Sequence, residues 1–178
     1  MSDRQIATLA GGCFWCLEAV YEQMRGVDKV VSGYIAGEQP NPSYEAVCTG
    51  ETGHAEAVQI TFDPAQVSYG ELLAVFFSIH DPTTLNRQGN DQGTQYRSAI
   101  YYHSEEQRAQ AAEFFVELRK QHVFPNPLVT ELVAATTFYP AEDYHQHYFA
   151  NHPTQGYCQY VVAPKLAKFK AHFAAKMK

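Results

Sequence analysis

Hydrophobic and polar residues follow two different periods in the first part of the chain. Residues 6–11 form a short apolar run that ends in two glycines and predicts a strand. The period then becomes helical, with one apolar face made by Cys16, Leu17, Val20, Tyr21 and Met24. Gly26 closes this predicted helix, and residues 27–35 predict a second strand.

The middle of the chain repeats the change from strand to helix. Residues 56–62 alternate strictly, so that one face of a third strand is formed by Val58, Ile60 and Phe62. Ser68, with Glu71 three residues later, has the pattern of a capping box and predicts the start of a helix. Residues 96–102 are rich in β-forming side chains and predict a fourth strand.

The last part of the chain predicts further helices and two more extended segments. Ser104 and Gln107 predict another capped helix, and residues 128–135 predict a strand. Residues 141–149 indicate a short helix and residues 157–162 an extended segment. A C-terminal helix is indicated by Leu166, Phe169 and Phe173.

The order of these elements defines a fold class. The first five, together with the strand at residues 96–102, run β-α-β-β-α-β. This order predicts an α+β two-layer sandwich, in which an antiparallel ferredoxin-like core carries its helices on one face and extra helices follow at the C-terminus. The 178 residues fit a single domain spanning residues 1–178.

Composition narrows the class of protein further. Apolar residues make up 46% and charged residues 18%, which is typical of a folded globular chain. The net charge of −6 argues against nucleic-acid binding, and no apolar run is long enough to cross a bilayer. The first ten residues lack the basic and apolar regions of an export signal, so we expect a cytoplasmic protein with reduced thiols.

The most specific chemistry lies where the first strand meets the first helix. Cys13 and Cys16 flank Phe14 and Trp15 there, and a thiol at a helix N-terminus is favoured as thiolate. The pair fits a redox site, two buried structural cysteines, or half of a zinc site. The zinc interpretation is weakest because neither of the other two cysteines has a partner at ligand spacing. The bulky aromatic linker favours an enzyme with a small apolar substrate over a disulfide-exchange surface.

Eight histidines raise the question of a metal. His145 and His147 are two residues apart on a predicted helix and would therefore diverge, while His54 and His152 share no ligand spacing. We expect neither a metal nor a cofactor.

The sequence from Gly12 to Trp15 resembles the signature of the peptide methionine sulfoxide reductases of the A class, enzymes that repair one epimer of methionine sulfoxide. Further blocks resemble the same family in the same order along most of the chain. They lie at residues 32–34, 42–44, 53–58, 80–83, 88–98 and 156–158.

The resemblance implies a set of catalytic residues. It makes Cys13 the nucleophile and places around the sulfoxide the side chains Glu56, Tyr44, Tyr96 and Asp91. Phe14 and Trp15 would hold the terminal methyl group of the substrate. Cys13 would take the oxygen as a sulfenic acid, and thioredoxin would reduce the disulfide that follows.

The pattern of the predicted strands agrees with part of this assignment. Glu56 shares its face of the third strand with Ile60 and should be buried, which raises the pKa of a carboxyl group. A neutral Glu56 could donate a proton to the sulfoxide oxygen. Tyr96 has the same parity as Ile100 in the fourth predicted strand, so we expect it to face the apolar side.

The thiol that resolves the sulfenic acid is Cys16, Cys158, or both in a relay. Cys16 lies one helical turn from Cys13, near the reach of a disulfide. Cys158 matches the resolving position of some family members, but the strand-like residues 159–162 argue against a mobile tail and favour Cys16. We expect Cys48 to be a buried hydrophobe in a helical turn.

The resemblance therefore implies a monomeric, thioredoxin-dependent enzyme that reduces methionine S-sulfoxide, free or in proteins. Two alternatives remain at this point. One is a thiol–disulfide oxidoreductase that uses Cys13 and Cys16 alone, and the other is a non-catalytic domain that binds methionine-rich partners.

Overall fold

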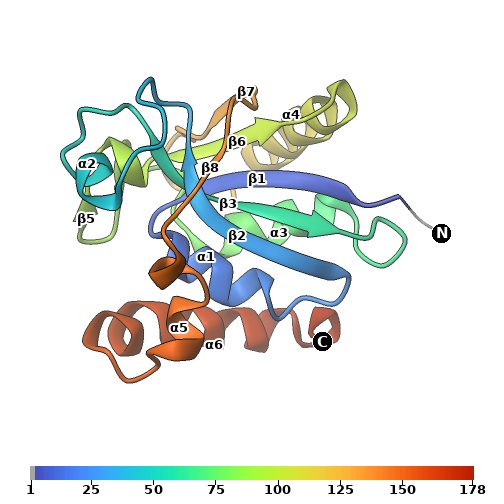
Figure 1. Cartoon of the computed structure of the whole chain (residues 1–178). Coiled ribbons are helices and arrows are strands. Elements are labelled where there is room, and N and C mark those ends of the chain that lie inside the picture. Colours follow the sequence, from blue (N-terminus) through green and yellow to red (C-terminus); the bar gives the residue numbers. More distant parts are fainter. Residues whose placement is uncertain (1–2) are drawn as a thin grey trace.

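The computed structural model describes residues 3–178, and their longest strands form one sheet (Figure 1). Its strands lie in the order β7-β6-β1-β3-β2-β8. Their bounds are β1 Gln5–Gly11, β2 Val27–Ile35, β3 Ala55–Phe62, β6 Ser98–Tyr102, β7 Glu131–Ala134 and β8 Tyr139–Pro140. A separate hairpin joins β4 (Arg87–Gln88) to β5 (Asp91–Gln92).

The four central strands have the predicted ferredoxin-like arrangement. β1 pairs antiparallel with both β3 and β6, and β3 pairs antiparallel with β2. β7 adds a parallel strand beside β6, and β8 adds an antiparallel strand beside β2. The predicted α+β sandwich is therefore confirmed, with a wider sheet than the sequence pattern indicated.

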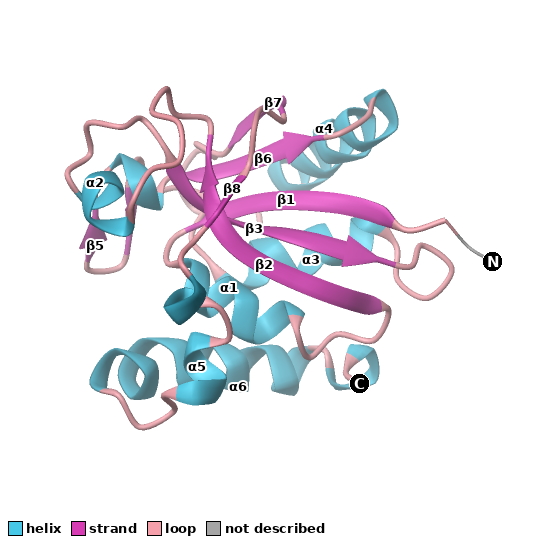
Figure 2. Ribbon diagram, in the orientation of Figure 1, coloured by secondary structure: helices cyan, strands magenta, loops and turns pink. Residues whose placement is uncertain are grey.

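Helices cover the sheet and form a further layer (Figure 2). α1 contacts β2 and β3, α3 contacts β1, and α4 contacts β6 and β7. α6 packs against α1 and α3, beside α5. The bounds are α1 Phe14–Tyr21, α2 Tyr44–Cys48, α3 Tyr69–Ile79, α4 Glu105–Lys120, α5 Tyr148–Asn151 and α6 Ala163–His172. None of the helices within residues 3–178 combines the length and apolar character needed to cross a bilayer.

The alternation along β3 separates the two sides of the sheet. Val58, Ile60 and Phe62 are fully buried in the large core beneath the helices. Ala55 and Ala57 belong to a smaller cluster on the opposite side. The prediction that Val58, Ile60 and Phe62 share one face of this strand is therefore confirmed.

Both predicted helix caps are present. The Ser68 side chain accepts a hydrogen bond from the Glu71 amide at 3.0 Å and starts α3. The Ser104 side chain accepts one from the Gln107 amide at 3.1 Å and starts α4. The C-terminal helix is confirmed as α6.

The extended segment predicted at residues 157–162 is wrong. Cys158–Val162 forms a π-helix that continues directly into α6. Its first amide is capped, because the Cys158 N–H donates to the Gln155 side chain at 3.0 Å. The buried residues of the combined helix follow helical spacing: Cys158, Val162, Leu166 and Phe169.

The helix predicted at residues 141–149 is also wrong as one unit. A 3-10 turn at Asp143–His145 and the short α5 are separated by His147, whose φ of 56° breaks any continuous helix. His145 and His147 therefore do not share a helix.

Three smaller predictions differ from the structure. Tyr96 lies in a 3-10 turn, Thr94–Tyr96, before β6, so its predicted strand parity is wrong. β7 is shorter than the strand predicted at residues 128–135. Cys48 lies in a helical turn as predicted, but it is exposed rather than buried.

Candidate active site

Cys13 lies at the turn that joins β1 to α1. It is the residue before the first turn of α1 and is only 7% exposed. Gly12 precedes Cys13 in this turn and has a φ of +93°, a conformation that favours glycine. A Cβ atom added at Gly12 would lie 2.8 Å from Cγ of Gln88. The turn thus needs glycine for both its backbone conformation and its packing.

The electrostatics of Cys13 differ from those of an exposed helix-start thiol. Burial raises the pKa of Cys13, and a hydrogen bond to the Cys16 thiol and the nearby Glu56 raise it further. The backbone N–H of Trp15 acts in the opposite direction. The thiolate expected from the helix N-terminus is therefore disfavoured by desolvation before a substrate binds.

Glu56 reaches the same place from β3. Its side chain is fully buried, and Oε1 accepts a hydrogen bond from the Phe14 amide at 3.2 Å. Oε2 has no hydrogen-bond partner among residues 3–178. Burial raises the pKa of Glu56 to about 8, although the Phe14 amide opposes the shift. Glu56 is thus mainly a neutral acid at pH 7, as its strand position predicted.

Two tyrosines complete the polar side of the site. Tyr44 begins α2, and its ring stacks on Phe14 at a centroid distance of 6.5 Å. Tyr96 comes from the 3-10 turn. Burial, followed by the charge of Glu56, raises the pKa of both tyrosines. Both hydroxyl groups therefore keep their protons and can donate hydrogen bonds.

Asp91 lies on β5 and accepts a hydrogen bond from the Tyr157 hydroxyl. Its charge helps to raise the pKa of Glu56 after the larger effect of burial. The hairpin that carries Asp91 thus reaches the same site as β3 and α1, so the structure brings together all five residues predicted to be catalytic.

An aromatic wall stands beside Cys13. The Trp15 ring stacks on Tyr148 at 3.8 Å with an interplanar angle of 6°, and Tyr157 meets it edge-on at 5.8 Å. The Trp15 indole N–H donates to Nδ1 of His145 at 3.1 Å. Such a wall suits an apolar group of a small ligand.

Sequence reasoning missed His145, Tyr148 and the ring of Tyr157 as parts of the site. His145 is 1% exposed, and its ring packs against those of Phe14 and Tyr44 at centroid distances of 5.1 and 4.5 Å. Because Nδ1 accepts from the indole, the neutral ring carries its proton on Nε2, which has no partner among residues 3–178. No spacing signal marked His145, whereas Tyr157 lay inside a block already attributed to the family.

Three cysteines lie near one another. The Cys13 thiol is hydrogen-bonded to Cys16 and lowers the pKa of Cys16. Cys158 is fully buried, and its pKa is raised first by burial and then by Cys16. Cys16 is thus electrostatically coupled to both of the others. Cys48 stands apart and contacts the Tyr44 side chain.

Curated relatives match this chain over nearly its whole length. A peptide methionine sulfoxide reductase MsrA from Polynucleobacter asymbioticus is 65% identical over 167 residues, which cover 94% of this chain and 88% of the relative. The protein of the same description from Deinococcus radiodurans is 56% identical, with 97% and 84% covered.

Solved structures show the same similarity. Mxr1 from Saccharomyces cerevisiae in reduced form has a TM-score of 0.79 and 35% identity, with 89% of this chain and 92% of that chain covered. Methionine sulfoxide reductase A of Corynebacterium diphtheriae has a TM-score of 0.77 and 35% identity, with 88% and 78% covered.

The family comparison agrees with both results. Residues 5–177 match the family described as peptide methionine sulfoxide reductase. This match includes every element that contributes to the site. The chain therefore belongs to the peptide methionine sulfoxide reductase family.

Proposed function

We propose that this protein reduces methionine S-sulfoxide, free or within proteins, to methionine. The observation that supports this most directly is the buried Cys13 thiol beside the neutral Glu56 carboxyl, next to an aromatic wall. We further propose that residues 1–178 act as one catalytic domain, as a monomer and in the cytoplasm, where reduced thiols persist.

The aromatic wall orients the substrate. Phe14 and Trp15 hold the terminal methyl group, because their apolar faces suit a methyl group better than an oxygen. The sulfoxide oxygen then faces the acid and hydroxyl donors of Glu56, Tyr44 and Tyr96. Only one epimer can present its lone pair to Cys13, its oxygen to these donors and its methyl group to the wall at the same time, which supports selectivity for one epimer. The resemblance to the A class makes this the S form.

The chemical step moves one oxygen atom from the substrate to Cys13. The Cys13 sulfur attacks the sulfoxide sulfur while Glu56 protonates the oxygen and both tyrosines donate hydrogen bonds to it. The attack forms a transient S–S bond, and the thiol proton of Cys13 replaces the proton that Glu56 donates. The S–O bond of the substrate and the transient S–S bond then break as the hydroxyl group passes to the Cys13 sulfur, so that methionine leaves and Cys13 becomes a sulfenic acid. The substrate sulfur is reduced by two electrons and the Cys13 sulfur is oxidised by two.

A second thiol then regenerates Cys13. We propose that Cys16 attacks the sulfenic sulfur, forming a Cys13–Cys16 disulfide and releasing water. The closeness of the two thiols, each of which shifts the pKa of the other, supports Cys16 as the first partner. Cys158, coupled to Cys16, can receive the disulfide in a second exchange.

Thioredoxin is the proposed final reductant. A structure described as Mxr1 from Saccharomyces cerevisiae in complex with Trx2 matches this chain with a TM-score of 0.56 and 26% identity. It covers 83% of this chain and 88% of that chain. That complex supports the same class of reductant here.

The test is dithiothreitol-dependent reduction of the separated S and R epimers of a methionine sulfoxide peptide. We expect turnover of the S epimer alone. Reduction of insulin disulfides without sulfoxide turnover would identify a thiol–disulfide oxidoreductase. Binding of the peptide without either reaction would identify a non-catalytic domain. Both results would contradict the proposal.

A further inference from the structure

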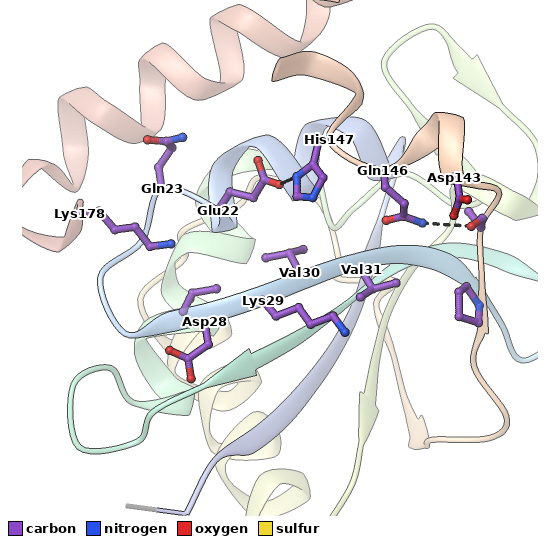
Figure 3. Close-up of a pocket in the computed structure, with 13 residues that line it drawn as sticks. Glu22, Gln23, Asp28, Lys29, Val30, Val31, Asp143, Gln146, His147 and Lys178 are labelled. Carbon is purple, nitrogen blue, oxygen red and sulfur yellow. Dashed lines mark hydrogen bonds and ion pairs between the residues drawn. The ribbon is translucent and has the colours of Figure 1, made fainter. Parts of the chain in front are cut away.

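A second group of polar side chains lies at the other end of α1. Glu18 and Glu22 are four residues apart on this end of the helix, and His147 faces them from the segment before α5. One carboxylate oxygen of each glutamate and one ring nitrogen of His147 lie within 4.8 Å of one another. Figure 3 shows Glu22 and His147 pointing toward each other at the side of a groove.

Glu18 distinguishes this group from an ordinary surface cluster. Its side chain is 1% exposed, and Oε1 accepts a hydrogen bond from the His147 amide at 2.7 Å. Oε2 is buried and has no hydrogen-bond partner among residues 3–178. A buried carboxylate oxygen without a donor is costly, and a bound cation would satisfy it.

The other two side chains give the group an open side. Glu22 Oε1 contacts Nδ1 of His147, whose side chain is 60% exposed while that of Glu22 is 21% exposed. A cation can therefore enter from the groove and keep water as a further ligand. The charged groups that face Glu18 are Glu22 and His147.

We propose that Glu18, Glu22 and His147 form a binding site for Zn²⁺ or a similar first-row divalent cation. Two carboxylates and one imidazole, with a water in the fourth position, make a zinc coordination shell. Mg²⁺ and Ca²⁺ fit less well, because they require more oxygen ligands.

This site lies outside the proposed reaction but joins two parts of the molecule. α1 follows directly from Cys13, whereas His147 is followed by Tyr148, which stacks on Trp15. A cation held between them would connect the helix to the segment that forms the aromatic wall. It should therefore stabilise the folded state by binding it in preference to the unfolded chain.

One of the reasons for expecting no metal was a helix shared by His145 and His147, which the structure does not contain. His147 adopts a left-handed conformation with φ 56°, and this turn separates it from His145. His122 has nearly the same conformation, with φ 52°, and it is exposed. His122→Asn is therefore a matched control for His147→Asn, since asparagine tolerates this conformation in both places.

The test titrates Zn²⁺ into the full chain, reduced with a phosphine because dithiothreitol binds metals. Wild type and His122→Asn should bind one equivalent with the same affinity and show the same rise in melting temperature. His147→Asn and Glu22→Gln should weaken binding by roughly tenfold or more and lose the rise. Circular dichroism without metal checks that each variant is folded.

The cysteines could also bind zinc, so Co²⁺ serves as a spectroscopic probe. Ligation by nitrogen and oxygen gives weak visible bands without intense sulfur-to-metal charge transfer. Strong charge transfer, undiminished affinity in both variants, or no Zn²⁺ binding by wild type would each overturn the proposal.

Discussion

Desolvation acts on both residues proposed to perform the chemistry. It raises the pKa of Cys13 and of Glu56, so the site without substrate holds a neutral thiol beside a neutral acid. A neutral acid is what protonation of a sulfoxide oxygen requires. The same burial makes the thiolate costly, which links formation of the nucleophile to the presence of substrate.

Cys13→Ser should abolish reduction of methionine sulfoxide while the chain stays folded. A hydroxyl group cannot accept the oxygen as a sulfenic acid, and the substitution removes little volume from the turn. Methionine formation in a single turnover without reductant is the measurement, with circular dichroism as the check on folding. Activity of more than a trace would assign the nucleophile elsewhere.

Glu56→Gln should slow the reduction step by roughly 10² to 10⁴-fold, because it removes the proton donor but keeps a similar shape. In wild type the rate should fall as the pH rises through about 8, where Glu56 loses its proton. Single-turnover rates across this range test both statements. An unchanged pH profile in the variant would show that another group supplies the proton.

The sequence predicted Glu56 correctly because β3 is a regular strand whose alternation survives folding. The same argument was wrong for Tyr96, since a 3-10 turn after Gly93, with a φ of 139°, precedes β6. No pattern in the sequence indicated that His145 lies beside Trp15. Its position depends on a turn that brings it against Trp15 from 130 residues away in sequence.

At the scale of elements, the segment after Cys158 shows how tertiary packing overrides local preference. Tyr160 and Val161 favour an extended chain by their residue type. The structure instead makes them helical, because Cys158 and Val162 are buried in register with Leu166 of α6. A rigid strand after Cys158 was the argument against Cys158 as the resolving thiol, and the structure removes it. The proposal that Cys16 resolves the sulfenic acid therefore depends on the closeness of Cys16 to Cys13.

Cys16→Ser and Cys158→Ser should separate the two resolving steps. After one turnover without reductant, Cys158→Ser should contain a Cys13–Cys16 disulfide, because Cys16 lies in the first turn of α1 that Cys13 precedes and each thiol shifts the pKa of the other. Cys16→Ser should still form one equivalent of methionine but lose cycling supported by thioredoxin. Peptide mapping identifies the bridges. A Cys13–Cys158 bridge in Cys16→Ser, with no bridge in Cys158→Ser, would make Cys158 the first resolving thiol.

Two helix caps offer a test of local structure. Ser68→Ala and Ser104→Ala each remove a side chain that accepts an amide hydrogen bond, so each should lower the free energy of unfolding by about 1 kcal/mol. Ser78→Ala is the control, because its hydroxyl donates to the Val75 carbonyl within α3 and caps nothing. Urea unfolding is the measurement, and equal stability of the three variants would contradict the assignment of the caps.

At the scale of the whole molecule, the site depends on packing between distant parts of the chain. The β-α-β-β-α-β order was sufficient to predict the central sheet, because alternating strands and capped helices are local patterns. β8 could not be predicted, since it is two residues long and exists by pairing with β2. The aromatic wall likewise forms only when the segment before α6 packs against α1.

The buried Glu56 should also make the stability of the whole chain depend on pH. Its pKa rises from 4.5 to about 8 on folding, so between these values the folded chain keeps a proton that the unfolded chain releases. Stability should therefore fall with rising pH in this window by up to about 1.4 kcal/mol per pH unit from this group. Other groups add their own pH dependence, so the test compares Glu56→Gln with wild type by urea unfolding. The free energy of unfolding of the variant should rise relative to that of wild type from about pH 5 to about pH 8. A substitution at an exposed site, Glu106→Gln, should show no such rise. A constant difference between Glu56→Gln and wild type would mean that Glu56 is ionised in the folded protein, and it could not then be the acid.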